Sequence, residues 1–365
     1  MGWTPPDGID VPKWKLSNHL REASVNNVST IGMDIAKQVF QIHGADAAGN
    51  PILRKKISRG QVLKFFASQP ACLVAMETCG GSHYWAREIS KLGHAVKLIA
   101  PKYVKPFVKR QKNDAADAEA ICEAAQRPTM RFVAFKSETA QASVLVFRTR
   151  DLLVRQRTQL INALRGHLTE YGVVAARGAS HVEKLIELMH KCASLPEDVR
   201  SLLSVLIETM RELDEKIAGL DRQIGRRVKS DADAKRLMTI PGVGPIIATA
   251  IAALAPPAET FKRGRDFAAW VGLTPLQESS GGKEKLGATS RMGERTLRRL
   301  LIIGASAVVR QAAAHGAPPH SWLARMLARK PRMLVTVALA NKMARIAWAL
   351  MRKGEVYRAP TVVAA

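Results

Sequence analysis

The sequence predicts a mixed α/β domain followed by a mainly helical region, and three observations support this fold class. Between residues 29 and 135, short strand patterns bounded by turn residues alternate with helical patterns. From residue 136 onward strand signals become rare, and apolar residues recur at helical spacing. The chain of 365 residues is 47% hydrophobic, which is enough to bury the cores of two or three domains. The predicted class is therefore α/β plus all-α.

The segment 29–135 has the strand and helix order of a mixed sheet. Strands are expected at 30–34, 39–43, 51–57, 71–76 and 95–99, and helices at 82–92 and 113–125. A Gly49–Asn50 turn separates the second strand from the third, and Asn113 is a suitable N-cap for the last helix. A meander of three strands followed by alternating helices and strands indicates a ribonuclease-H-like domain.

The segment 136–235 is predicted to be a helical coiled-coil linker or oligomerisation region. Its apolar residues alternate at spacings of four and three: Val199, Leu203, Leu206, Met210, Leu213, Ile217, Leu220 and Ile224. Such a heptad seam needs a partner helix. An antiparallel hairpin within one chain and a dimer both provide one, and the pattern does not choose between them.

The segment 236–355 is predicted to be a mainly helical C-terminal domain. The sequence Ile240-Pro-Gly-Val-Gly-Pro245 precedes an apolar helix and is similar to the second half of a helix-hairpin-helix element. Gly242 and Gly244 would let backbone N–H groups approach a phosphate at the helix N-terminus, although a tight turn between core helices also explains them. Residues 1–28 are expected to form an accessory or flexible arm, and residues 356–365 a tail.

The charge of the chain points to a polyanionic partner. Lys and Arg number 56 and Asp and Glu 31, which gives a net charge of +25. Nucleic acid is the first candidate. We expect no membrane partner, because no apolar run reaches the ~20 residues that span a bilayer. The four cysteines form no CxxC pair and no signal peptide is evident, so neither a zinc site nor disulfides are expected, and the cytoplasm is the predicted location.

Four acidic residues lie where a metal site would need them. Asp34 ends the first predicted strand, Glu77 follows a buried strand, and Asp114 and Asp117 share one helix face. Carboxylates held on rigid elements can bind Mg²⁺, which can act on a phosphodiester. Taken singly, each acid is more often structural than catalytic.

Basic residues precede the last two acids. The segment 97–112 has six Lys or Arg and no acid, and it leads directly into Asp114. A DNA backbone running past a metal site would suit this pattern. The expected nucleic-acid contacts here are Lys102, Lys105, Lys109, Arg110 and Lys112.

Two adjacent serines offer a candidate nucleophile. Ser279 and Ser280 precede Gly281 and Gly282 in a polar loop, which is expected to be flexible and to expose a hydroxyl. The basic residues that follow could stabilise the charge of a phosphoryl transition state: Lys283, Lys285, Arg291, Arg295, Arg298 and Arg299. A surface turn rich in Ser and Gly is the simpler alternative. No His lies nearby to complete a hydrolase triad.

A third basic stretch lies near the C-terminus. Residues 321–353 carry eight Lys or Arg and no acid on a helical pattern. A face exposed only to solvent should carry some acids, so nucleic-acid contact is expected there too.

Together, these motifs resemble one family. The segments, in chain order, are Gly32-Met-Asp34-Ile-Ala-Lys37, Met76-Glu77-Thr-Cys-Gly80, Lys112-Asn-Asp114-Ala-Ala-Asp117-Ala-Glu119-Ala120, Ile240-Pro-Gly-Val-Gly244 and Ser279-Ser-Gly-Gly-Lys283. This combination is similar to the DEDD-type transposases of bacterial insertion sequences, the bridge-RNA-guided recombinases. The resemblance covers about residues 29–353.

The resemblance implies a resolvase-like domain, a coiled-coil linker and a C-terminal transposase domain with a nucleophilic serine. Asp34, Glu77, Asp114 and Asp117 match the family's four metal-binding catalytic acids, and the serine falls at Ser280, with Ser279 as the other choice. The implied cofactor is Mg²⁺. The implied partners are element and target DNA, a structured noncoding guide RNA and further copies of the chain, as a dimer or tetramer associated with the bacterial nucleoid.

Two other classes of function fit the same residues. A metal-dependent nuclease or Holliday-junction resolvase would use the acids with water and would not need the serine. A non-catalytic nucleic-acid-binding protein would need only the basic surface.

Overall fold

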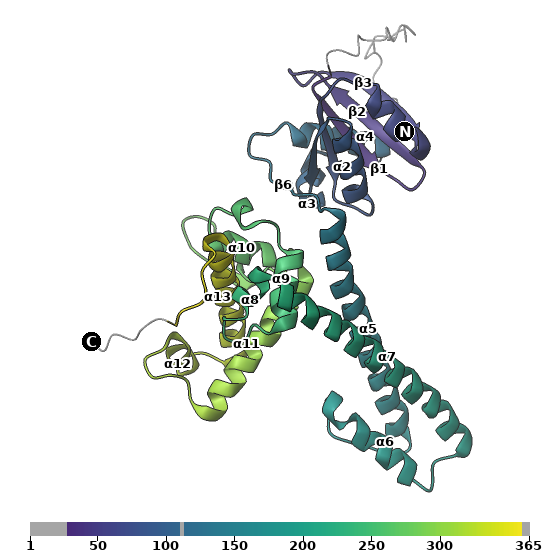
Figure 1. Ribbon diagram of the computed structural model, residues 1–365, viewed down its shortest axis with the longest axis vertical. Coiled ribbons are helices and arrows are strands. Elements are labelled where there is room, and N and C mark those ends of the chain that lie inside the picture. Colours follow the sequence, from purple (N-terminus) through teal and green to yellow (C-terminus); the bar gives the residue numbers. More distant parts are fainter. Residues whose placement is uncertain (1–27, 110–112, 360–365) are drawn as a thin grey trace, which may run out of the picture. The chain divides into compact units, whose positions relative to one another are not determined.

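The computed structural model describes residues 28–109 and 113–359, which form two compact units that divide between Ser137 and Glu138 (Figure 1). Almost all of the predicted N-terminal arm, residues 1–27, lies outside the described residues, as do residues 360–365 of the predicted tail. The first unit is mixed α/β and the second is mainly helical, which confirms the predicted fold class.

A six-stranded sheet in the order β3-β2-β1-β4-β5-β6 organises the first unit. Its strands are β1 (Thr30–Ile35), β2 (Val39–Ala45), β3 (Pro51–Ser58), β4 (Leu73–Glu77), β5 (Ala95–Ile99) and β6 (Phe132–Val133). Strands β1, β4 and β5 are parallel, whereas β2 and β6 run antiparallel to their neighbours. All five predicted strands are present. The sixth was not predicted because two residues are too few to show a periodicity.

Helices cover both faces of this sheet, and side chains alternate between the two faces. Helices α1 (Val62–Ala67) and α2 (Ser82–Lys91) pack on one face, with Ile31 and Met33 of β1 in the shared core. Helix α4 (Asp114–Ala125) packs on the other face, over β1 and β2. Two short turns, α3 (Pro101–Val104) and η3 (Lys105–Phe107), lie between β5 and α4.

The second unit begins with a helical hairpin. Helices α5 (Glu138–Glu170) and α7 (Glu197–Ser230) pack along each other, and α6 (Val182–Lys191) lies at their connecting end (Figure 1). The seam residues Leu203, Met210 and Ile217 are buried within the chain. The intramolecular hairpin therefore accounts for the heptad pattern.

Ion pairs join the two long helices of this hairpin to each other, and a shared core joins the hairpin to the rest of the unit. Arg150 contacts Asp221 with an Nη2–Oδ2 distance of 3.0 Å, and Arg157 contacts Asp214. Phe147 of α5 belongs to the core formed by the C-terminal helices. The α5–α7 hairpin thus shares its core with the helices that follow it.

The C-terminal helices surround one core and carry a small β-hairpin. The elements are α8 (Ala232–Leu237), α9 (Pro245–Leu254), α10 (Gly264–Val271), β7 (Pro275–Gln277), β8 (Leu286–Thr289), α11 (Arg295–His315), α12 (Trp322–Leu327) and α13 (Arg332–Lys353). Among the described residues, α13 alone is long and apolar enough to be a candidate membrane span, although Lys342 and Arg345 interrupt its apolar residues. Its apolar residues, such as Val335, Ala340 and Ala344, are buried in this core, which explains its composition.

Candidate active site

The sheet register places Asp34 and Glu77 side by side. Met33 of β1 pairs with Met76 of β4, and the two acids are the next residues along these parallel strands. Because Met33 and Met76 point into the core under α1 and α2, the alternation places both acids on the opposite face, which α4 covers.

Small residues let α4 approach this face closely. A Cβ atom on Gly32 would lie 2.3 Å from the backbone oxygen of Ala118, so any larger residue would push the helix away. The helix begins at Asp114, and the Asn113 side chain accepts a hydrogen bond from the Ala115 N–H at 3.0 Å, which confirms the predicted N-cap. The first turn of α4 therefore lies beside the end of β1.

Three carboxylates converge at this point. Oxygen atoms of Asp34, Asp114 and Asp117 all lie within 4.8 Å of one another. Two oxygens bound to one Mg²⁺ lie about 3 to 4 Å apart, so small side-chain rotations would allow all three to bind one ion. Three carboxylates so close together repel one another unless a cation lies between them. The donor set, which consists only of oxygen atoms, fits a hard divalent cation.

The fourth acid lies within the electrostatic field of this cluster. Burial raises the pKa of Glu77, and the charges of Asp34 and Asp117 raise it further. Sequence reasoning missed a neighbour, Cys79, whose thiol pKa is raised by burial and then by Glu77 and Asp34. Its position two residues after Glu77 was the available signal. The charge effects on these two pKa values, which are smaller than the effect of burial, reflect a negative potential that a bound cation would offset.

The basic residues expected beside this cluster are used in different ways. Lys109 donates to Glu119 at 3.0 Å, so a neighbouring carboxylate already neutralises it. The ammonium of Lys102 lies 4.6 Å from the centre of the Tyr103 ring, and Lys105 is exposed. Arg110 and Lys112 lie outside the described residues.

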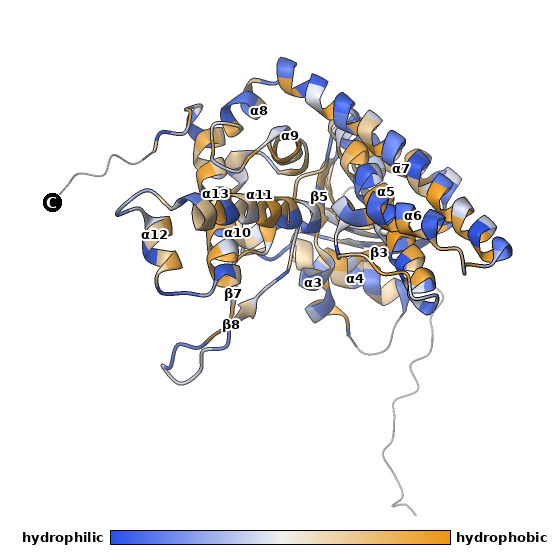
Figure 2. Cartoon of the chain, turned by 90° about the horizontal axis from the view of Figure 1, so that it is seen from below, coloured by the Kyte–Doolittle hydropathy of each residue, from blue (hydrophilic) through white to orange (hydrophobic). Residues whose placement is uncertain are grey.

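The two serines lie in the loop of a β-hairpin, between β7 and β8. Gly281 and Gly282 have φ values of +56° and +77°, which suit the tight two-residue turns that connect hairpin strands. The turn is closed by Lys283, whose N–H donates to the Ser280 backbone oxygen at 3.1 Å. The hairpin of β7 and β8 projects from the helices of its unit (Figure 2).

The hairpin distinguishes the two serine hydroxyls. The Oγ atom of Ser279 accepts a hydrogen bond from the Lys285 N–H at 3.1 Å. Ser280 is exposed at the edge of the turn, and its hydroxyl has no hydrogen bond to any described residue. Both serines are exposed, and the two hydroxyls differ in that only the Ser279 hydroxyl accepts a hydrogen bond from another described residue.

The basic residues after the hairpin divide into structural and accessible groups. Arg298 donates to the backbone oxygens of Val271 and Met292, both at 3.0 Å, and burial followed by the charge of Arg295 lowers its pKa. It thus braces the base of the hairpin, and Arg299 contacts Asp151.

The other basic residues of this run lie on or near the hairpin. The Lys285 ammonium lies 3.8 Å from a Glu278 carboxylate oxygen. Lys283, Arg291 and Arg295 are exposed. Of the six basic residues predicted between Lys283 and Arg299, these three therefore remain available to a phosphate.

The two glycines of the predicted phosphate-binding turn have different surroundings. A Cβ atom on Gly304 of α11 would lie 2.2 Å from the backbone oxygen of Gly242, so Gly242 serves close packing of this turn against α11. Gly244 is the N-cap residue of α9, and the space around its Cα is open. Only Gly244 keeps the geometry expected for an approaching phosphate.

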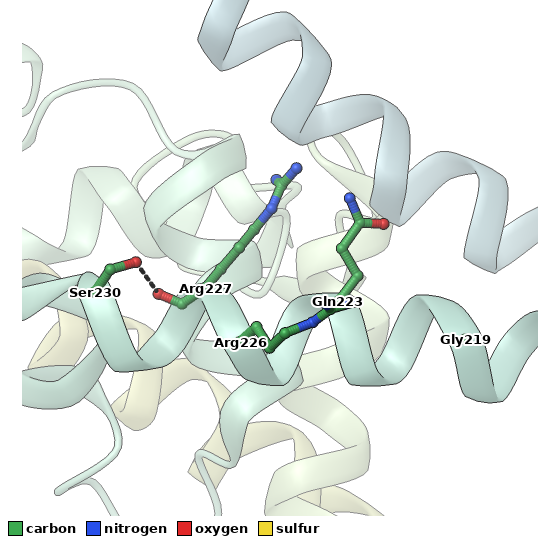
Figure 3. A pocket seen from close by; sticks show the side chains of 5 residues that line it. All are labelled: Gly219, Gln223, Arg226, Arg227 and Ser230. Atoms are coloured by element: carbon green, nitrogen blue, oxygen red, sulfur yellow. Dashed lines mark hydrogen bonds between the residues drawn. The ribbon is translucent and has the colours of Figure 1, made fainter.

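A surface hollow of about 490 Å³ lies along α7. Its lining residues are Gly219, Gln223, Arg226, Arg227 and Ser230 (Figure 3). It contains none of the predicted catalytic residues. The acids belong to the first unit and the serines to the second.

Comparisons with known proteins give the class of this chain. One family model, described as a transposase, matches residues 31–173, and a second, described as the transposase IS116/IS110/IS902 family, matches residues 234–318. A Pseudomonas aeruginosa protein named "Probable family 20 transposase" is 50% identical, with 91% of this chain and 99% of that protein covered.

Two relatives are named after their mobile elements. The transposase for insertion sequence element IS1328 of Yersinia enterocolitica is 41% identical over 91% of this chain and 99% of the relative. The transposase for insertion sequence element IS1111A of Coxiella burnetii is 38% identical over 97% of this chain and 99% of the relative.

The fold, the carboxylate cluster and these similarities define a DEDD-type transposase, an enzyme class that cuts and rejoins DNA. The chain belongs to the IS116/IS110/IS902 family of transposases. The resemblance inferred from the sequence motifs is confirmed at this level.

Proposed function

We propose that this transposase cuts and rejoins DNA through a covalent serine–DNA intermediate, with Mg²⁺ held by Asp34, Glu77, Asp114 and Asp117. The observation that carries this proposal is the convergence of three of these carboxylates within 4.8 Å, with Glu77 beside them. The bound cation would polarise the phosphate and neutralise charge that develops on it.

Ser280 is the proposed nucleophile. Its hydroxyl oxygen attacks the phosphorus of a phosphodiester, and its proton passes to solvent or to a cluster carboxylate. The P–O bond to the 3′ oxygen breaks and this oxygen takes a proton from solvent, so the 5′ phosphate is esterified to the serine and a 3′ hydroxyl is released. Because the phosphodiester energy is retained, a new 3′ hydroxyl can displace the serine without ATP. The exposed Lys283 and Arg295 would bind the flanking phosphates.

The proposed domain is ribonuclease-H-like. The strand order β3-β2-β1-β4-β5, with only β2 antiparallel to β1, supports this assignment. The acids at the ends of β1 and β4 and at the start of α4 then face one edge of the sheet, where a DNA strand can reach them. The proposed domain limits are 29–135, 136–235 and 236–355.

We further propose a homo-oligomer that acts with a structured noncoding RNA in the bacterial cytoplasm, at the nucleoid. The acids and the serine belong to different units, so copies of the chain could combine the acids of one with the serine of another. The net charge of +25 suits both RNA and DNA, and base pairing by the RNA would select the DNA sequence.

A metal-dependent nuclease that uses water is the second candidate. The carboxylate cluster is complete within the first unit and needs no residue of the hairpin to bind a cation, which favours this alternative. A protein that only binds nucleic acid is the third, and it would show salt-dependent binding without strand breakage.

Cleavage of element-end DNA distinguishes these candidates. The protein would be incubated with this DNA, the flanking noncoding RNA and Mg²⁺, using Asp34→Asn, Ser280→Ala and the double variant Ser279→Ala/Ser280→Ala. We expect Asp34→Asn and Ser280→Ala to abolish cleavage. Full cleavage by the double variant would establish the water-dependent nuclease, and no cleavage by the wild type with RNA and Mg²⁺ would establish the binding protein.

A further inference from the structure

The end of the chain carries a charge excess that its own structure does not neutralise. Between Arg295 and Gly354 there are twelve Lys or Arg and no Asp or Glu. Arg298 donates to backbone oxygens and Arg299 pairs with Asp151, and most of the remaining cations lie on α12, on α13 or between them. A folded surface with so many cations and no acids is suited to a polyanion.

Three of these cations gather where α12 packs on α13. Burial lowers the pKa of Lys342, and the nearby charges of Arg345 and Arg325 lower it further. Like charges placed together are unfavourable unless an anion offsets them. No ion pair involves these three side chains within residues 28–109 and 113–359.

The cluster is held in place by contacts that leave its charged groups available. The Lys342 ammonium lies 4.7 Å from the centre of the Trp322 ring, and both side chains are half-buried. This cation–π contact orients the ammonium without neutralising it. Arg325 donates through Nη1 to the His320 backbone oxygen at 3.2 Å, and its guanidinium is otherwise exposed. Such preorganisation lowers the entropy lost when a ligand binds.

We propose that Arg325, Lys342 and Arg345 form a cradle for the phosphodiester backbone of a nucleic acid, with Trp322 positioning Lys342. None of these residues belongs to the carboxylate cluster or to the serine hairpin. The identity of the polyanion as a nucleic acid rests on the proposed function. DNA and RNA share the backbone chemistry that the cradle recognises, and the experiment tests both.

Binding would be measured with the full chain, a short DNA duplex and an RNA stem-loop, over a series of salt concentrations. Lys342→Met keeps the aliphatic stem beside Trp322 and removes the charge, and Arg345→Gln is combined with it. Lys184→Gln is the matched control, because Lys184 lies on α6 and is paired with Glu187 at 3.1 Å. Melting curves establish that each variant is folded.

We expect the double variant to reduce the slope of log affinity against log salt concentration by about 1 for each cation removed. The control should leave the slope unchanged. A reduced slope for DNA, for RNA or for both supports the cradle and identifies its ligand. An unchanged slope for both in a folded double variant would overturn it.

Trp322 is tested as a positioning residue. Trp322→Leu should reduce the affinity in the same assay, and Trp322→Phe should restore most of it, because a ring again lies under the ammonium. Equal affinity for both variants would overturn the role of the ring. DNA cleavage by the wild type is recorded separately, so failure of the cradle leaves the serine chemistry intact, and failure of cleavage leaves the binding result valid.

Discussion

Replacing Asp117 with Asn should stabilise the metal-free protein and reduce the further stabilisation that Mg²⁺ binding provides. The carboxylates of Asp34 and Asp117 lie within 4.8 Å of each other and are both half-buried. Two unit charges at this separation repel by about 1 kcal/mol in water and by about 3 kcal/mol at an effective dielectric of ~20. Asp117 also lies in the first turn of α4, where a negative charge contributes about 0.3 to 1 kcal/mol to stability.

The repulsion exceeds this helix contribution, so we expect a net gain of about 1 to 2 kcal/mol, which is a rise of several degrees in the melting temperature of the first unit. Mg²⁺ at about 100 times its Kd would stabilise the wild type by about 2.7 kcal/mol, and most of this gain should be lost in the variant.

Thermal melting with and without Mg²⁺ measures both quantities. Glu123→Gln is the control, because Glu123 lies on the same helix but pairs with Arg127 at 2.8 Å, away from the cluster. Its response to Mg²⁺ should equal that of the wild type. An Asp117→Asn protein that melts below the wild type without metal and gains as much from Mg²⁺ would show that the carboxylates do not repel each other as expected and do not bind the ion together.

Three further predictions use other readouts. Gly32→Ala should displace α4 and abolish the Mg²⁺-dependent rise in melting temperature although all four acids remain, and an unchanged rise would contradict the close-packing argument. Alkylation of Cys79 near pH 8 should become faster with Mg²⁺, because a cation that offsets the neighbouring carboxylates lowers the raised pKa of the thiol, and slower alkylation would place the cation elsewhere. A mixture of Asp34→Asn and Ser280→Ala proteins should regain part of the cleavage activity if acids and serine act across copies, and no recovery at any ratio would show that they act within one copy.

The carboxylate site was predictable because strands and helices constrain their ends. Alternation along β1 and β4 places Asp34 and Glu77 on one face, and the N-cap at Asn113 fixes where α4 begins. The register between strands and the closeness of α4 were not predictable from one sequence. They depend on contacts such as that of Gly32 with Ala118, which are far apart along the chain.

The C-terminal predictions were less complete for the same reason. Charge alone grouped Arg298 with the nucleic-acid contacts, whereas its hydrogen bonds to Val271 and Met292 give it a structural role. The Gly281–Gly282 pair was read as flexible, although two adjacent glycines between short strands also predict a tight hairpin. Pattern reasoning located the important segments but not the partners of their side chains.

Mapping a covalent protein–DNA adduct tests the central claim most directly. The wild-type protein, element-end DNA, the flanking noncoding RNA and Mg²⁺ would be combined and denatured, and the DNA-linked peptide would be identified by mass spectrometry. The account predicts a 5′-phosphate ester on Ser280 that is absent without Mg²⁺ and absent in Asp34→Asn. Cleaved DNA with no protein attached, or an adduct on a residue outside the hairpin, would contradict it.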